Sequence, residues 1–367
     1  MNRPLLAIAA CLALALPVAA QEGDETPPSP GQIVDAAQPQ EWVAIEPEDL
    51  LVMTLAPAAD GSERVVVIQL MPAPFSQGWV ENIRTLARAS WYDGISVNRV
   101  QDNYVVQWGD PGYDNPENGE TETKPLPEGL NVMSEADYPA SGLLSIPDPR
   151  GRPRFDYTLG AMMIRNAMTA SGDEFPIPDA MPLSEEDLKA AAEHEPDLSD
   201  NYGSVASLVL GWPVTGEMGK DANRFWPVHC YGMVGVGRSY SPDTVSGAEL
   251  YTVIGHAPRH LDRNIALVGR IISGMEHLSS MPRGSGALGF YTEEEAEKRT
   301  PITSIRVASD LPEAARPQFE YLSTESMSFG AYAEARANRR DPFFIHPAGG
   351  ADICNIPVPV RAVAPTE

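Results

Sequence analysis

The chain of 367 residues contains 43% hydrophobic residues, enough to bury the core of one large domain, with or without a smaller one. Its net charge of -25 argues against binding to nucleic acid or anionic lipid, because an acidic surface repels both. The 35 prolines are spread along the chain, which indicates many loops and strand edges and excludes a collagen-like repeat.

Residues 1–20 are predicted to be a secretory signal peptide. A short positive segment ending at Arg3 precedes an apolar run over residues 4–17, and small residues follow before Gln21. Cleavage is expected after Ala20, and lipoprotein processing at Cys11 is the competing interpretation. The run is too short to span a bilayer, and no later segment predicts a transmembrane helix. We therefore expect an exported protein, periplasmic in a bacterium with two membranes.

The segment 21–41 is rich in Glu, Asp, Pro and Gly and is predicted to be a flexible linker, with structure beginning near Trp42. A β-branched strand is expected over residues 64–70, after a turn at Asp60-Gly61. A helix is expected over 76–87, with Ser76 as its N-cap. Two strands are expected over 94–100 and 104–109.

Residues 111–227 are Pro-, Gly- and acid-rich, so strands are hard to place there, and we expect a long insertion. Strand patterns return at 229–236, 249–254 and 265–270, followed by a short helix over 274–278. The region 301–367 is expected to be a C-terminal extension that packs on the preceding domain. It has a strand over 302–307, a helix over 326–339 and a closing strand over 356–363.

Three further patterns suggest chemistry only weakly. Residues 284–289 spell GxGxxG but follow no buried strand, which argues against dinucleotide binding. Pro258 separates His256 from His260, so a shared helix face and a metal site are not expected. The run 293–295 of three glutamates is typical of a solvated helix start.

Removal of the signal peptide leaves two cysteines, Cys230 and Cys354. In an exported protein, two cysteines favour one disulfide, which would tie the C-terminal tail to the body of the domain. Two separate buried thiols are the alternative.

Ordered motifs in residues 50–110 and 228–280 resemble the two halves of a cyclophilin. Tyr104-Val105-Val106-Gln107-Trp108-Gly109-Asp110 is similar to the family's Phe-x-x-Gln-Gly-Gly-Asp. Ser246-Gly247-Ala248-Glu249-Leu250-Tyr251 is similar to Asn-Gly-Ser-Gln-Phe-Phe. Matching segments also lie at 81–86, 92–100, 231–234, 260–262 and 268–271.

The resemblance implies a mostly β fold, a closed antiparallel eight-stranded barrel with capping helices, to which this chain adds the Pro-rich insertion. The barrel's halves would be 42–110 and 228–300. It also implies a peptidyl-prolyl cis–trans isomerase that needs no cofactor or metal and acts on proline-containing polypeptides. Arg99 and Gln107 match the catalytic positions. The matched substrate-binding positions are Tyr104, Val105, Val234, Gly235, Glu249, Tyr251, His260, Leu261 and Ile265.

Several matched positions depart from the family's usual residues. Asn98 replaces His and Val105 replaces Met, while Gly235 replaces an Asn that contacts peptide backbone. Glu249 replaces Gln, His260 a Trp of some members, and Ile265 replaces His. The arginine and the apolar wall remain, so the reaction type is expected to persist. The alternative is a weak or inactive module that only binds proline-containing peptides or partner proteins.

Overall fold

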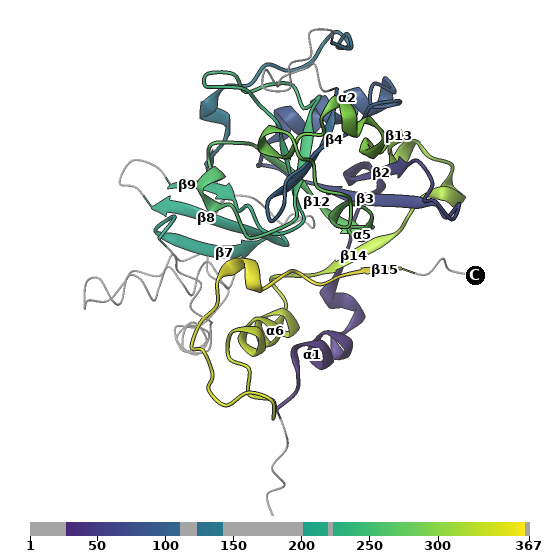
Figure 1. Ribbon diagram of the computed structural model, residues 1–367. Helices are drawn as coiled ribbons and strands as arrows, with labels where there is room; N and C mark the ends of the chain where they lie inside the picture. Colours follow the sequence, from purple (N-terminus) through teal and green to yellow (C-terminus); the bar gives the residue numbers. More distant parts are fainter. Residues whose placement is uncertain (1–26, 111–122, 142–200, 219–222, 364–367) are drawn as a thin grey trace, which may run out of the picture.

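The structure of the protein is a computed structural model that describes residues 27–110, 123–141, 201–218 and 223–363 (Figure 1). The expected signal peptide and most of the expected insertion lie outside these residues. In the described part of the chain, no helix is both long enough and apolar enough to cross a membrane.

An antiparallel sheet of eight strands, counted over the described residues, forms a nearly closed barrel with the order β13-β2-β3-β12-β10-β11-β5-β4. Its two edges meet through three backbone hydrogen bonds, from Val97 N to Thr300 O (2.9 Å), from Ile302 N to Ile95 O (2.8 Å) and from Gly94 N to Ile302 O (3.0 Å). The strands are β2 (Leu50–Leu55), β3 (Arg64–Leu70), β4 (Ser96–Val100), β5 (Val105–Gly109), β10 (Met233–Val236), β11 (Leu250–Val253), β12 (Leu267–Ser273) and β13 (Ile302–Val307).

The barrel differs from the sequence-based prediction in one boundary and in one strand. Strand β13 was assigned to the C-terminal extension, but it pairs with β2 along its length, so the barrel continues past residue 300. Strand β2 was not predicted at all. It forms a hairpin with β3 across the expected turn, in which Gly61 has a φ of +83°.

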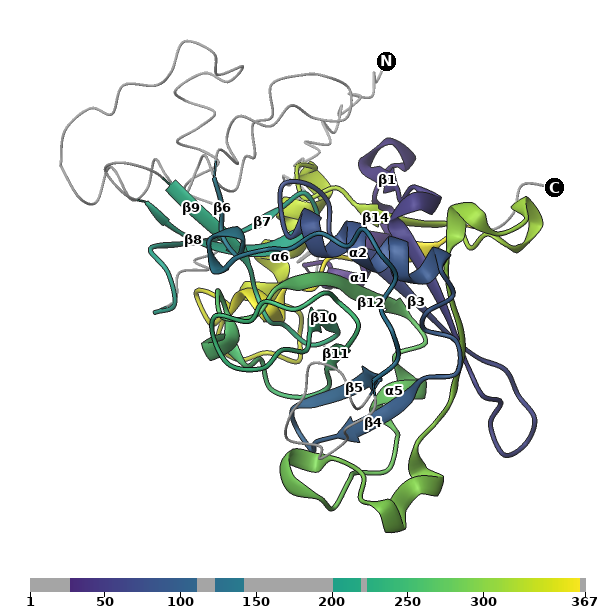
Figure 2. The same ribbon diagram turned by 90° about the horizontal axis from the view of Figure 1, so that it is seen from above.

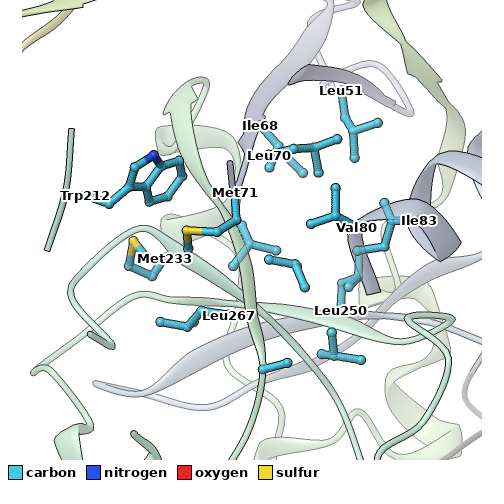
Figure 3. Packing of buried hydrophobic residues seen from close by; sticks show 14 of the residues in the cluster. Leu51, Ile68, Leu70, Met71, Val80, Ile83, Trp212, Met233, Leu250 and Leu267 are labelled. Carbon is cyan, nitrogen blue, oxygen red and sulfur yellow. The ribbon is translucent and has the colours of Figure 1, made fainter. Parts of the chain in front are cut away.

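The side chains inside the barrel belong to the main hydrophobic core, which continues beyond the barrel (Figure 3). Successive strand residues face opposite sides of a sheet, so Val106 and Trp108 of β5 pack in this core while Val105 does not. Helix α2 (Gln77–Arg88) contributes Val80 and Ile83 to the same core. Ser76 occupies its N-cap as predicted, but with φ of 51° and without a capping hydrogen bond from its side chain.

The described part of the insertion forms a second antiparallel sheet, in the order β6-β9-β8-β7, which the sequence did not reveal. Its strands are β6 (Ala140–Ser141), β7 (Val205–Val209), β8 (Trp212–Met218) and β9 (Asn223–Pro227). Buried Arg270 of β12 joins this sheet to the barrel, because its Nη1 donates to Gly211 O (2.8 Å) and its guanidinium stacks on Trp212 (4.5 Å). Burial lowers the pKa of Arg270 to about 10.

A third sheet and two helices lie beside the barrel and next to the β7–β8 turn, where Gly211 N donates to Thr324 Oγ1 at 3.2 Å (Figure 1). Strand β14 (Phe319–Leu322) pairs with β1 (Trp42–Ala44) and with β15 (Val360–Ala362). Below them, α1 (Pro30–Ala36) packs against α6 (Met327–Ala337). The prediction of a flexible linker is therefore wrong for α1, which begins with a capping box between Ser29 and Gln32.

A disulfide joins Cys230, just before β10, to Cys354 in the tail, with a Cα–Cα distance of 5.1 Å. The two cysteines are separated by 124 positions in the sequence. The C-terminal extension is thus covalently attached to the barrel, as the sequence favoured. The short helix expected over residues 274–278 is present as α5 (Glu276–Ser279).

Removing this disulfide should destabilise the protein. Closing a loop of more than a hundred residues restricts the unfolded chain, so replacing both Cys230 and Cys354 by Ala should lower the free energy of unfolding by roughly 3–5 kcal/mol. Denaturant titration of the oxidised wild type, the reduced wild type and the double variant measures this. The reduced wild type should match the variant; equal midpoints for all three would contradict the prediction.

Candidate functional site

One row of residues in register crosses the outer faces of four neighbouring strands. Arg99 of β4 pairs with Gln107 of β5, Gln107 pairs with Tyr251 of β11, and Tyr251 pairs with Gly235 of β10. Residues in register on adjacent strands lie on the same face, so two widely separated parts of the sequence meet here. The structure therefore brings together both residues that were matched to the catalytic positions.

Arg99 is held by hydrogen bonds from each of its guanidinium nitrogens. Nη1 donates to Gln107 Oε1 at 2.9 Å, Nε donates to Leu288 O at 2.7 Å, and Nη2 donates to Gln101 Oε1. A guanidinium is planar and its donors have a fixed fork geometry, so these bonds set the plane of the group.

Two aromatic rings also contact the Arg99 guanidinium. Its Cζ lies 5.6 Å from the centroid of Tyr104 and 5.3 Å from that of Phe290. Contacts of this kind between a cation and the face of a ring are attractive, more so where water is partly excluded. Tyr104 was expected at the site, whereas Phe290, Leu288 and Gln101 were not.

Glu249 fixes the orientation of Gln107. Gln107 Nε2 donates to Glu249 Oε1 at 2.7 Å, and the Glu249 side chain is fully buried. A carboxylate accepts hydrogen bonds, so the amide turns its NH₂ group to Glu249 and its oxygen to Arg99. The glutamate that departs from the family pattern thus belongs to the hydrogen-bonded chain behind the arginine.

Beside the hydrogen-bonded residues Arg99, Gln107 and Glu249 lies a small apolar cluster that is separate from the barrel core, hereafter the outer cluster. It contains the buried residues Val105, Tyr251 and Val253, with Tyr104 and Ile265 packed against them at its edge. Four of these five match the expected substrate-binding positions. Val253 was missed, although its position two residues after Tyr251 places it on the same face.

Three other matched positions lie outside the outer cluster. Val234 is 1% exposed and packs in the barrel core. Leu261 is half-buried in a 3₁₀ helix (Arg259–Leu261), and its carbonyl accepts from Ile265 N at 3.2 Å. His260, in the same turn, is exposed.

Gly235 leaves space for the ring of Tyr251. A Cβ atom at position 235 would overlap the Tyr251 hydroxyl oxygen and two atoms of that ring, including Cε1 at 2.7 Å. Aromatic residues cover glycines in this way on neighbouring strands. The glycine that replaces the family's asparagine is therefore matched to the tyrosine that replaces its phenylalanine.

A buried polar chain lies behind Tyr251. Its hydroxyl donates to Nε2 of His229 at 2.8 Å, and Nδ1 of His229 donates to Asp262 Oδ1 at 2.8 Å. Arg259 Nε in turn donates to Asp262 Oδ2 at 2.7 Å. Burial lowers the pKa of His229 and raises that of Tyr251, so both are neutral near pH 7.

Metal ligation has no support in the described ranges, where no group of three or more His, Cys, Asp or Glu residues is placed to hold an ion.

The buried His229 predicts that stability depends on pH. The folded-state pKa lies below the ordinary value of 6.5. Below pH 6.5 the unfolded chain therefore takes up a proton that folded His229 does not. Its contribution to stability is complete above pH 6.5 and is lost by about 1.4 kcal/mol per pH unit as pH falls toward the folded pKa.

Denaturant titrations between about pH 7.5 and about pH 5.5 measure this loss. His229→Gln should be less stable at neutral pH but should lack this part of the pH dependence. His256→Gln, at an exposed histidine, should keep the dependence of the wild type. Parallel pH curves for the wild type and His229→Gln would contradict the prediction.

Comparison with known proteins agrees with this geometry. The family model described as "Cyclophilin type peptidyl-prolyl cis-trans isomerase/CLD" matches residues 66–307, more than half of the chain. The fold is similar to that of the cyclophilin AquaCyp293 from Hirschia baltica, with a TM-score of 0.53 at 17% identity over 89% of this chain and 95% of that one.

A cyclophilin-type isomerase from Cryptosporidium parvum matches with a TM-score of 0.33 at 11% identity, over 71% of this chain and 96% of that one. No curated protein matches. The barrel, confirmed in its strand number and antiparallel pairing, and the family match over residues 66–307 together show that the chain belongs to the cyclophilin-type peptidyl-prolyl cis–trans isomerase family.

Proposed function

We propose that Arg99 catalyses the isomerisation by donating a hydrogen bond to the prolyl nitrogen of a twisted peptide bond. The observation that carries this proposal is the guanidinium itself, which is held in one plane at the edge of the outer cluster. We further propose that the substrates are exported proteins in the course of folding.

The reaction needs help with rotation rather than with bond cleavage. Delocalisation of the nitrogen lone pair into the carbonyl gives a barrier of about 18–20 kcal/mol. When the bond twists, the lone pair returns to nitrogen, which becomes a better hydrogen-bond acceptor. A donor that meets this nitrogen only in the twisted state lowers the barrier, because it stabilises the transition state more than the planar amide. Such chemistry requires no nucleophile.

The surroundings of Arg99 suit this task. Gln107 and Glu249 orient the guanidinium before substrate arrives, so little reorganisation is needed during reaction. Tyr104, Val105 and Tyr251 offer an apolar surface on which the proline ring can lie with water excluded. An apolar ring and a polar nitrogen of one imide would thus meet matching groups on one face of the barrel.

Replacing Arg99 tests the mechanism. Arg99→Ala should lower kcat/KM for a short Ala-Pro peptide by about 100-fold or more, the usual effect of removing a positioned transition-state donor. Arg99→Lys should recover little, because an ammonium lacks the planar fork. Exchange spectroscopy or a protease-coupled assay measures the rate. Arg340→Ala, at an exposed arginine paired with Glu334, is the control and should match the wild type. If Arg99→Ala isomerises the peptide as fast as the wild type, the arginine mechanism is wrong.

One observation favours a second function, in which the barrel binds proline-containing segments with little turnover. The Tyr251 ring covers Gly235, the position at which the family resemblance implied a contact with peptide backbone. A module of this kind would bind a proline peptide with equal affinity before and after Arg99→Ala, and neither protein would accelerate isomerisation. Titration calorimetry alongside the rate assay separates the two functions.

The proposed location outside the cytoplasm rests on two observations. Residues 1–20 have the pattern of a secretory signal, and Cys230 and Cys354 form the kind of disulfide that persists in oxidising compartments. Protein recovered from the periplasm of a two-membrane host should begin at Gln21 by N-terminal sequencing. Recovery from the cytoplasm with residues 1–20 intact would contradict both the signal and the exported substrates.

A further inference from the structure

The segment 284–291, which contains the GxGxxG pattern, lies directly against β4 (Figure 2). Gly284 N donates to Val100 O at 3.0 Å, and Tyr291 N donates to Asn98 O at 3.0 Å. These two carbonyls belong to the neighbours of Arg99 on either side. The segment, hereafter the glycine loop, is therefore attached to the backbone around the arginine.

The glycines of this loop are required by close backbone approach. A Cβ at Gly286 would lie 2.7 Å from Phe290 O, and one at Gly289 would lie 2.7 Å from Gln101 Cα. Leu288 and Gly289 both have positive φ, of 53° and 82°. The glycines thus allow a tight turn whose backbone lies in close contact with the end of β4.

A buried carboxylate anchors the loop from behind. Glu295 accepts hydrogen bonds from the backbone N of Ser285 (3.0 Å) and of Thr292 (3.2 Å), and it pairs with Lys298 at 2.6 Å. The hydrogen bond from Lys298 and those from the loop lower the pKa of Glu295 to about 2. The expectation of a solvated helix start is therefore wrong for Glu295, which is only 9% exposed.

The loop places two groups on Arg99 and leaves one facing solvent. Leu288 O accepts from Arg99 Nε, and the Phe290 ring lies 5.3 Å from Cζ. Phe290 is 8% exposed, whereas the Leu288 side chain is 47% exposed although its carbonyl touches the guanidinium. An apolar side chain is thus accessible immediately beside the proposed hydrogen-bond donor.

We propose that the glycine loop is a positioning and specificity element of the isomerase site. Phe290 and the Leu288 carbonyl keep the Arg99 guanidinium in its working plane, and the Leu288 side chain contacts an apolar peptide residue flanking the proline. This inference rests on the proposed role of Arg99. Phe290 and Leu288 act on rate and on peptide choice, respectively.

The row of residues across the barrel indicates on which side of the proline the peptide residue that contacts Leu288 should lie. Gly235 is at one end of the row, and Arg99, with the loop beside it, is at the other. With the proline on the outer cluster between them, one flanking residue extends toward β10 and the other toward Leu288. Only the second should respond to a change at Leu288.

The first test removes the ring beside the arginine. Phe290→Leu should lower kcat by about 3- to 30-fold with a smaller change in KM, because the ring orients a donor that acts in the transition state. Phe290→Tyr, which keeps the ring, should recover most of the rate. Phe344→Leu is the matched control, since Phe344 stacks on Arg339 at 4.5 Å in the C-terminal segment, and its rate should equal that of the wild type.

The second test changes the exposed side chain. Leu288→Asp should reduce kcat/KM for peptides with an apolar residue at one of the two positions flanking proline. It should leave peptides with Gly at that position unchanged. Ile345→Asp, at a site that is 86% exposed, controls for a new surface charge. Two panels that vary the residue before and the residue after proline identify the position.

The outcomes separate this inference from the proposed mechanism. If Arg99→Ala abolishes activity while Phe290→Leu, folded by thermal melting, keeps the wild-type kcat, the positioning role is wrong and the mechanism stands. If Leu288→Asp affects all peptides equally, the specificity role is wrong. If Arg99→Ala is as active as the wild type, the proposed mechanism is wrong, and the positioning role of the loop is wrong with it.

Discussion

The orientation of the Arg99 guanidinium is the constraint on which the rest of the site depends. An arginine side chain has many rotamers, and restricting them costs conformational entropy. Here the restriction is made by groups from three parts of the chain, namely Gln107 on β5, Glu249 just before β11, and the glycine loop after α5. The barrel is what brings these parts together, because its strand order places β4, β5 and β11 side by side.

Three of the residues that depart from the family pattern make specific contacts with neighbouring residues in this structure. Glu249 determines which end of the Gln107 amide faces the arginine. Gly235 makes room for Tyr251, whose hydroxyl then reaches His229. Asn98 is buried, and its Nδ2 donates to Gly109 O at 2.8 Å. Each replacement is supported by a neighbour that a position-by-position comparison does not consider.

Sequence patterns predicted the barrel, α2, β13 and the cysteine pair, because these depend on local periodicity or on ordered motifs. The sheet of the insertion escaped prediction since β8 contains Pro213 and β9 ends at Pro227, and proline ordinarily argues against strands. Helix α1 is only seven residues long and depends on packing against α6, which no local pattern reveals. The sequence of the glycine loop was considered only as a dinucleotide-binding motif, and its contact with Arg99 is evident only from the fold.

The buried hydrogen-bonded residues behind Tyr251 connect the outer cluster to the insertion and to the C-terminal tail. His229, which binds the Tyr251 hydroxyl, is next to Cys230, whose disulfide attaches the tail. Arg259, the last residue of this hydrogen-bonded series, stacks on Tyr202 of the insertion at 4.6 Å. Asp262 lies between them and accepts from both. Buried polar groups tolerate few arrangements. A shift of the tail or of the insertion would therefore displace the ring of Tyr251 in the outer cluster. The insertion and the tail are thus linked, through these buried polar contacts, to the face of the barrel that carries Arg99.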